Sequence, residues 1–115
     1  MKSSTGLDEN IAGALCYLFG LITGIIFFIL EKDSEFVKFH AMQSIIAFGT
    51  LWIANWVVAL FFMFVPFIDV FLVSLIKILT FIVWIVCMIK AYQGDRFKLP
   101  IIGEIAEEQA KRIKI

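Results

Sequence analysis

Long parts of this sequence lack charge. Residues 11–30 carry no charged side chain, residues 39–68 carry only His40 as a titratable group near their start, and residues 70–89 are interrupted once, by Lys77. The hydrocarbon core of a bilayer is about 30 Å thick and requires roughly 20 apolar residues in a helix. Each run is long enough to cross it, which excludes a soluble domain and predicts an integral membrane protein.

The residue types that form catalytic and metal sites are also scarce. The 115 residues include one His and two Cys, and no nucleophile has an obvious base nearby. One His without a second ligand does not predict a metal site. The net charge is zero and no basic–aromatic patch is present, so nucleic acid is not an expected partner. We expect a non-enzymatic protein without a cofactor or metal.

The two cysteines lie at different ends of the apolar sequence. Cys16 is near the start of the first apolar run and Cys87 near the end of the third. In a chain with three spans they fall toward opposite faces of the bilayer, roughly 15–20 Å apart in depth. A disulfide requires Cα atoms within about 7 Å. This topology excludes an intramolecular disulfide and leaves the cysteines as small packing residues.

Apolar residues are abundant, at 62% of the chain, against about 45–50% in soluble domains. We expect an all-α integral membrane protein, a bundle of three transmembrane helices. Its transmembrane domain covers residues 11–93, with spans at about 11–30, 41–64 and 70–90. Residues 1–10 form a short extracytoplasmic lead, and residues 94–115 form a cytoplasmic tail.

Polar residues directly before the apolar runs predict where the helices begin. Asp8 or Asn10 can cap the first helix, Asp33 or Ser34 the second, and Asp69 the third.

The C-terminal tail predicts an amphipathic helix. One helical face carries Ile102, Ile105, Ala106, Gln109 and Ile113, while Glu and Lys residues occupy much of the rest. Such a helix is expected to lie at the membrane interface. The alternative is a frayed tail.

The distribution of Lys and Arg predicts the orientation. With three spans, one side of the membrane holds only Lys2, and the other holds Lys32, Lys38, Lys90, Arg96, Lys98, Lys111, Arg112 and Lys114. Basic residues gather on the cytoplasmic side. We therefore expect a multi-pass protein of the cell membrane with its N-terminus outside and its C-terminus in the cytoplasm.

Glycines in the first apolar run predict close helix packing. Gly13, Gly20 and Gly24 share one helical face, and the last two form a GxxxG pattern. Folding the chain about residue 34 places Gly20 level with Gly49, which favours contact between the first two helices. The alternative is that Gly20 and Gly24 face another subunit.

Lys77 is the most unusual residue of the apolar runs. A Lys near the middle of the membrane costs about 2.5–3.5 kcal/mol on insertion scales. Folding the second hairpin about residue 66 places Lys77 level with Asn55, so we expect the two to be in contact. They would then bind a substrate, an ion or a lipid headgroup in a polar cavity. Alternatively, Lys77 extends to the headgroups on its long stem.

His40 and Gln43 are further polar candidates, near the cytoplasmic end of the second span. His40 could gate a proton path or bind headgroups, since it titrates close to physiological pH. The alternative is structural: it hydrogen-bonds a neighbouring helix end.

Several stretches resemble a family of small, uncharacterised prokaryotic multi-pass membrane proteins. They are AGALCYLFG at 12–20, FVKFHAMQS at 36–44, AYQG at 91–94 and FKLPIIGEIA at 97–106. That family is distantly similar to the Tic twenty-kilodalton component of the plastid protein-import translocon. The resemblance implies a fold and a membrane location, and its motif falls on His40, Gln43, Pro100 and Gly103. The import proteins are described with four spans, whereas three are predicted here.

The first functional hypothesis is a non-enzymatic subunit that assembles with itself or with a membrane complex. The chain is too small to enclose a pore alone, and the GxxxG face suits helix packing. The alternative is an oligomeric channel or transporter in which Lys77, Asn55 and His40 face a shared wet interior. Expected partners are the lipid bilayer and a further copy or another membrane protein.

Overall fold

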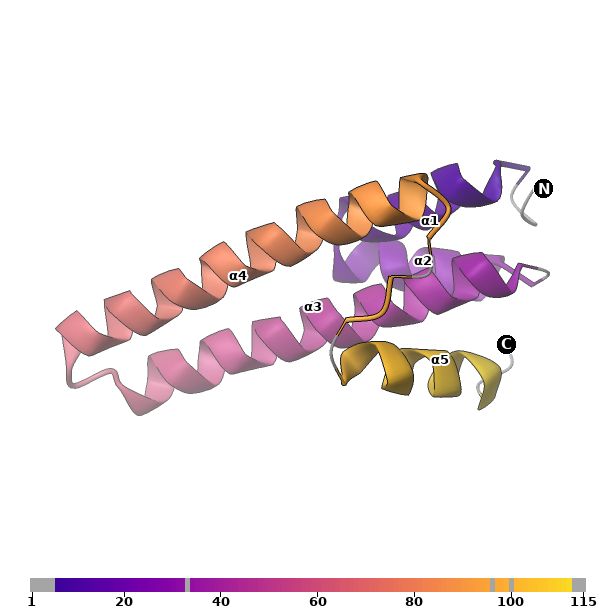
Figure 1. The fold of residues 1–115 in the computed structure, drawn as a ribbon. Coiled ribbons are helices and arrows are strands. Elements are labelled where there is room, and N and C mark those ends of the chain that lie inside the picture. Colours follow the sequence, from indigo (N-terminus) through magenta and orange to yellow (C-terminus); the bar gives the residue numbers. More distant parts are fainter. Residues whose placement is uncertain (1–5, 33, 96, 100, 113–115) are drawn as a thin grey trace.

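The computed structural model describes residues 6–32, 34–95, 97–99 and 101–112, and over these ranges it is all-helical (Figure 1). Its helices are α1 (Glu9–Leu18), α2 (Leu21–Leu30), α3 (Glu35–Phe61), α4 (Pro66–Tyr92) and α5 (Ile102–Arg112). The predicted all-α class is confirmed. The predictions that concern Asp33, Arg96, Pro100 and Ile113 lie outside the described residues.

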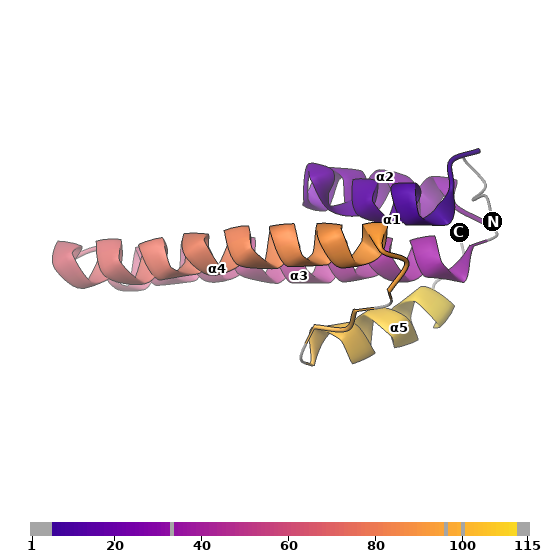
Figure 2. The same ribbon diagram turned by 45° about the horizontal axis from the view of Figure 1, so that its top comes forward.

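The molecule has a thick end and a thin end along its 51 Å axis. We call the thick end the body. There α1 and α2 lie on one side of the α3–α4 pair, and α5 lies on the other (Figure 2). At the thin end, α3 and α4 continue alone. We call residues 56–75 the arm; none of its residues is buried in the structure. The core of the chain is therefore confined to the body.

The first apolar run forms two helices instead of one. α1 ends at Leu18 and α2 begins at Leu21. Between them Gly20 has φ +60° and ψ −124°, in a region of positive φ that glycine adopts readily and other residues rarely. The chain reverses there, so that α1 and α2 form a hairpin (Figure 1). The prediction of one helix over residues 11–30 is wrong.

Side chains satisfy the backbone groups at this break. Inside an apolar region each free carbonyl needs a hydrogen-bond donor. The Trp84 Nε1 donates to the Leu18 carbonyl oxygen at 3.2 Å, and the Ser44 hydroxyl donates to the Gly20 carbonyl oxygen at 3.0 Å. The Thr23 hydroxyl also donates to Gly20, at 3.3 Å. The hairpin turn is thus held by α3 and α4 as well as by its own sequence.

Because the hairpin turns back, three spans are not confirmed. Two of the described helices, α3 and α4, are long and apolar enough to cross a membrane. The start of α1 and the end of α4 lie together, where the Asn10 side chain donates to the Tyr92 carbonyl oxygen at 3.0 Å. The prediction that the N-terminus lies outside and the C-terminus inside required an odd number of spans and is not confirmed.

The cysteines are the packing residues that the sequence predicts, but their predicted placement fails for the same reason. Cys16 and Cys87 are both buried in the core of the body and both are free thiols. Each lies near Tyr17, because α1 packs beside the C-terminal half of α4 instead of crossing the membrane. Their placement at opposite faces of the bilayer is wrong.

The helix starts match the capping predictions in part. Ser34 is the N-cap of α3, and its hydroxyl accepts a hydrogen bond from the Val37 amide at 3.2 Å. Asp8 occupies the N-cap position of α1 without a side-chain cap bond. Asp69 is not a cap: α4 begins one turn earlier at Pro66, since proline fits the first helical position, where no amide donor is needed.

The predicted amphipathic helix is present as α5, so the frayed-tail alternative is wrong for residues 102–112. It packs against α3 in the body, with Gly103 and Ala106 buried. A Cβ at Gly103 would lie 2.5 Å from the Lys98 Cβ, so this position requires glycine. The Lys98 ammonium pairs with Glu107 and lowers the pKa of that carboxyl. The helix therefore packs on α3 with part of its apolar face, while Ile105 is exposed, and its place at the membrane interface stays a prediction.

Candidate functional site

Two groups of polar residues stand out, one in the body and one where the body meets the arm. The first, which we call the latch, consists of Tyr17, His40 and Gln43, all fully buried. The Gln43 amide nitrogen donates to the Phe97 carbonyl oxygen at 2.8 Å, and its oxygen accepts from the Leu99 amide at 3.1 Å. One side chain thus pairs with the backbone of the segment that leads into α5.

The protonation of the latch follows from its acceptors. His40 Nε2 lies 2.9 Å from the Asp95 carbonyl oxygen, which can only accept, so this nitrogen carries a hydrogen. His40 Nδ1 lies 2.7 Å from the Tyr17 hydroxyl, which accepts from Gln43 at 2.9 Å, and in the neutral imidazole this nitrogen can accept the hydroxyl hydrogen. The neutral imidazole satisfies every one of these bonds.

The latch places His40 and Gln43 in one structural unit. His40 binds the backbone of Asp95, and Gln43 binds that of Phe97 and Leu99, which corresponds to the structural alternative for His40. Sequence reasoning missed Tyr17, which joins them. Gly13 belongs to the same region: a Cβ there would lie 2.8 Å from the Phe36 ring.

The other predicted glycines face the contact between α2 and α3. A Cβ at Gly24 would lie 3.0 Å from the Ser44 hydroxyl and 3.1 Å from the Ala41 carbonyl oxygen. Gly20 faces Phe48, and a Cβ at Gly49 would lie 3.8 Å from Leu21. Each of these glycines thus has its neighbours within the same chain, as the intramolecular alternative expects, although Gly20 and Gly49 are not among each other's nearest contacts.

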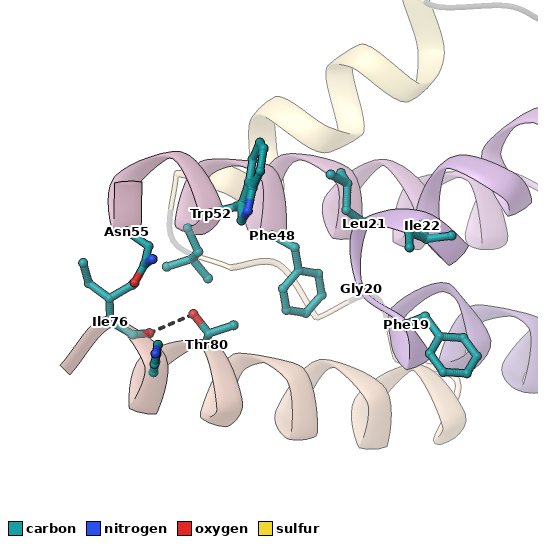
Figure 3. A pocket seen from close by; sticks show the side chains of 11 residues that line it. Phe19, Gly20, Leu21, Ile22, Phe48, Trp52, Asn55, Ile76 and Thr80 are labelled. Atoms are coloured by element: carbon teal, nitrogen blue, oxygen red, sulfur yellow. Dashed lines mark hydrogen bonds between the residues drawn. The ribbon is translucent and has the colours of Figure 1, made fainter. Parts of the chain in front are cut away.

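The second group surrounds a pocket of about 470 Å³ at the turn of the α1–α2 hairpin, which we call the tip pocket (Figure 3). The α1–α2 hairpin, α3 and α4 all contribute residues to it. Its lining residues are Phe19, Gly20, Leu21 and Ile22 from the hairpin, Phe48, Leu51, Trp52 and Asn55 from α3, and Ile76, Lys77 and Thr80 from α4.

Lys77 and Asn55 therefore share one pocket, whereas His40 does not line it. The expected direct contact is absent: no hydrogen bond joins the two side chains. The Asn55 oxygen is buried and has no hydrogen-bond partner among the described residues. Figure 3 shows this amide directed from α3 toward Ile76 on α4, where the Thr80 hydroxyl already donates to the Ile76 carbonyl oxygen at 2.8 Å. The pocket thus contains polar groups that the chain itself leaves unused.

The two long apolar helices and the apolar hairpin beside them define a helical membrane protein. The chain belongs to the magnetosome magnetite crystal formation protein family, whose model matches residues 8–106.

Several relatives are archaeal. The chain is 59% identical to a UPF0132 membrane protein of Methanocaldococcus jannaschii over 110 residues, 96% of each chain. It is 50% identical to a UPF0132 membrane protein of Archaeoglobus fulgidus over 103 residues, which are 90% of this chain and 96% of the relative. No solved structure matches. An uncharacterised membrane family is thus confirmed, while similarity to the plastid import component is not shown.

Proposed function

We propose that this protein is a non-enzymatic subunit that assembles in the membrane through its arm, with a further copy of the same chain as the partner. The arm carries the proposal. Over residues 56–75 two helices stand alone, with exposed side chains such as Leu60, 64% exposed, and Phe71, 60% exposed. In lipid, helices associate through close packing and interhelical hydrogen bonds.

A polar atom within the arm supports association. The Asp69 Oδ1 is buried and has no hydrogen-bond partner among the described residues. A buried acceptor without a donor costs about 1–3 kcal/mol, and a donor on a second arm would relieve this cost once the Asp69 side chain turns toward it. The latch supports the non-enzymatic part, because His40 and Gln43 direct their hydrogen bonds to the chain's own backbone and to Tyr17.

Cysteine cross-linking tests the assembly. We expect Leu60→Cys and Phe71→Cys to form disulfide-linked dimers in nanodiscs. The mass of the unmodified protein in nanodiscs should correspond to two or more copies. The matched control is Ile26→Cys on the outer face of α2, where 46% of the side chain is exposed. Cross-linking that is equal at all three positions, or a monomeric mass, would reject the proposal. If the protein instead forms a stable complex with a different membrane protein, such as a translocation complex, that protein is the partner and the second copy is not.

A second candidate, an oligomeric channel or transporter, is favoured by the tip pocket. Lys77 and Asn55 line it, but His40 is held in the latch and drops out of the proposed path. We expect Lys77→Leu to assemble normally in liposomes and to lose ion flux. Flux equal to that of the unmodified protein would remove this candidate.

A further inference from the structure

The turn of the α1–α2 hairpin brings a helix N-terminus to the wall of the tip pocket. The carbonyl oxygens of Leu18 and Gly20 already accept hydrogen bonds from side chains of α4 and α3. The N-terminus of α2, by contrast, has no side-chain cap. The first N–H groups of a helix have no partner within it and carry the positive end of its dipole. Leu21 and Ile22, the first two residues of α2, are among the residues that line the pocket, so this helix end lies at its wall.

Lys77 adds a full positive charge to the same space. It lines the tip pocket from the opposite side, on α4, and its side chain is exposed. No acidic side chain is present among the described residues that line the pocket. A lysine within the apolar segment of a membrane protein is costly unless a counter-charge accompanies it. The dipole and the ammonium group therefore favour the same ligand, an anion.

The rest of the lining is apolar, with Phe19, Phe48 and Trp52 among its residues. The pocket also lies where the hairpin stops and the arm begins, so the apolar surface of α3 and α4 continues beyond it. Half-helix N-termini near the middle of a membrane bind anionic groups in this way in transporters. The lining thus suits an anion that carries an apolar chain.

We propose that the tip pocket binds an anionic amphiphile, holding its carboxylate or phosphate group between Lys77 and the N-terminus of α2 while the apolar chain lies along the arm. A volume of about 470 Å³ is within the usual range of small-molecule pockets, about 300–1,000 Å³. This site goes beyond the proposed assembly and does not require it.

Binding is measured in nanodiscs of zwitterionic lipid with dibrominated stearate as the probe, since bromine quenches tryptophan fluorescence and Trp52 lines the pocket. We expect saturable quenching by the acid and only weak, non-saturating quenching by its uncharged methyl ester. Lys77→Met should raise the half-saturating concentration at least about tenfold, while Lys77→Arg should stay within about threefold. Lys111→Met is the matched control and should leave binding unchanged, because Lys111 lies on α5.

Equal, saturable quenching by acid and ester overturns the proposal, as does unchanged affinity in Lys77→Met. If Lys77→Met fails to insert, the comparison of acid with ester on the unmodified protein still decides. A second series identifies the source of the ligand. If anionic phospholipid in the nanodisc weakens stearate binding, the bilayer supplies the anion; if it has no effect, the ligand is a free single-chain acid.

Discussion

At the scale of single residues, Gln43 contributes most to the latch, because its amide forms three hydrogen bonds in a fully buried place. Gln43→Leu keeps most of the volume but leaves the Phe97 carbonyl and the Leu99 amide without their partner. We expect a loss of about 2–4 kcal/mol, since each unsatisfied buried group costs about 1–3 kcal/mol. Thermal unfolding in detergent and protease cleavage within residues 93–101 measure it.

The control for this prediction is another glutamine. Gln93 is exposed at the end of α4, and Gln93→Leu should change the unfolding midpoint little. Equal effects of the two substitutions would show that the latch contributes no stability.

The sequence indicates part of the latch. His40 and Gln43 stand out because polar side chains are rare in an apolar segment, and one alternative for His40 was a bond to a neighbouring helix end. Tyr17 gives a weaker signal, since most of a tyrosine side chain is apolar and its partners lie 23 and 26 positions away. Hydrophobicity reveals which side chains are unusual, and only the fold reveals which of them meet.

At the scale of helices, the α1–α2 hairpin depends on Thr23. Its hydroxyl donates to the Cys16 carbonyl oxygen at 3.1 Å and accepts from the Phe19 amide at 3.2 Å. Thr23→Val removes these two bonds and the longer one to the Gly20 carbonyl oxygen without changing the shape of the side chain, and we expect a loss of about 1–3 kcal/mol. Thermal unfolding in detergent checks this against Thr50→Val, in which an exposed threonine of α3 is changed. A Thr23 variant as stable as the Thr50 variant would contradict the role given to Thr23.

The contact between α2 and α3 depends on Gly24. Its missing Cβ would lie 3.1 Å from the Ala41 carbonyl oxygen, an atom of the α3 backbone that cannot move alone. Gly24→Ala must therefore separate the helices, and it should be at least about 1 kcal/mol less stable than Gly49→Ala. At Gly49 a Cβ meets only Leu21, at 3.8 Å, and alanine gains about 0.5–1 kcal/mol over glycine within a helix. Similar unfolding midpoints for the two variants would argue against this close approach.

The hairpin also shows what a hydropathy pattern leaves open. Residues 11–30 are apolar throughout, and this property is the same for one spanning helix and for two shorter helices that reverse direction. The glycines that suggested close packing are present in both arrangements. The reversal is set by Gly20 in a positive-φ conformation and by donors from Ser44 and Trp84. Two of these three residues come from other helices, so residues 11–30 alone contain only part of the information that predicts the reversal.

At the scale of the whole molecule, the fold brings the start of α1 and the end of α4 to the same end. The start of α1, the turn before α3 and the end of α4 lie at the body end, and residues 62–65 form the turn at the other end (Figure 1). None of the ten Lys and Arg residues falls in that turn. Because basic residues gather on the cytoplasmic side, we propose that the body faces the cytoplasm and the turn faces outward.

Labelling of single cysteines in intact cells with a membrane-impermeant maleimide tests this orientation. Met63→Cys, in the outer turn, should react before the cells are broken, since its side chain is 54% exposed. Leu7→Cys and Gln93→Cys should react only after lysis. The unmodified chain is the control, because Cys16 and Cys87 are buried and should stay unlabelled. If Leu7→Cys reacts in intact cells as Met63→Cys does, residues 11–30 cross the membrane after all, and the single span that their hydropathy predicts is restored.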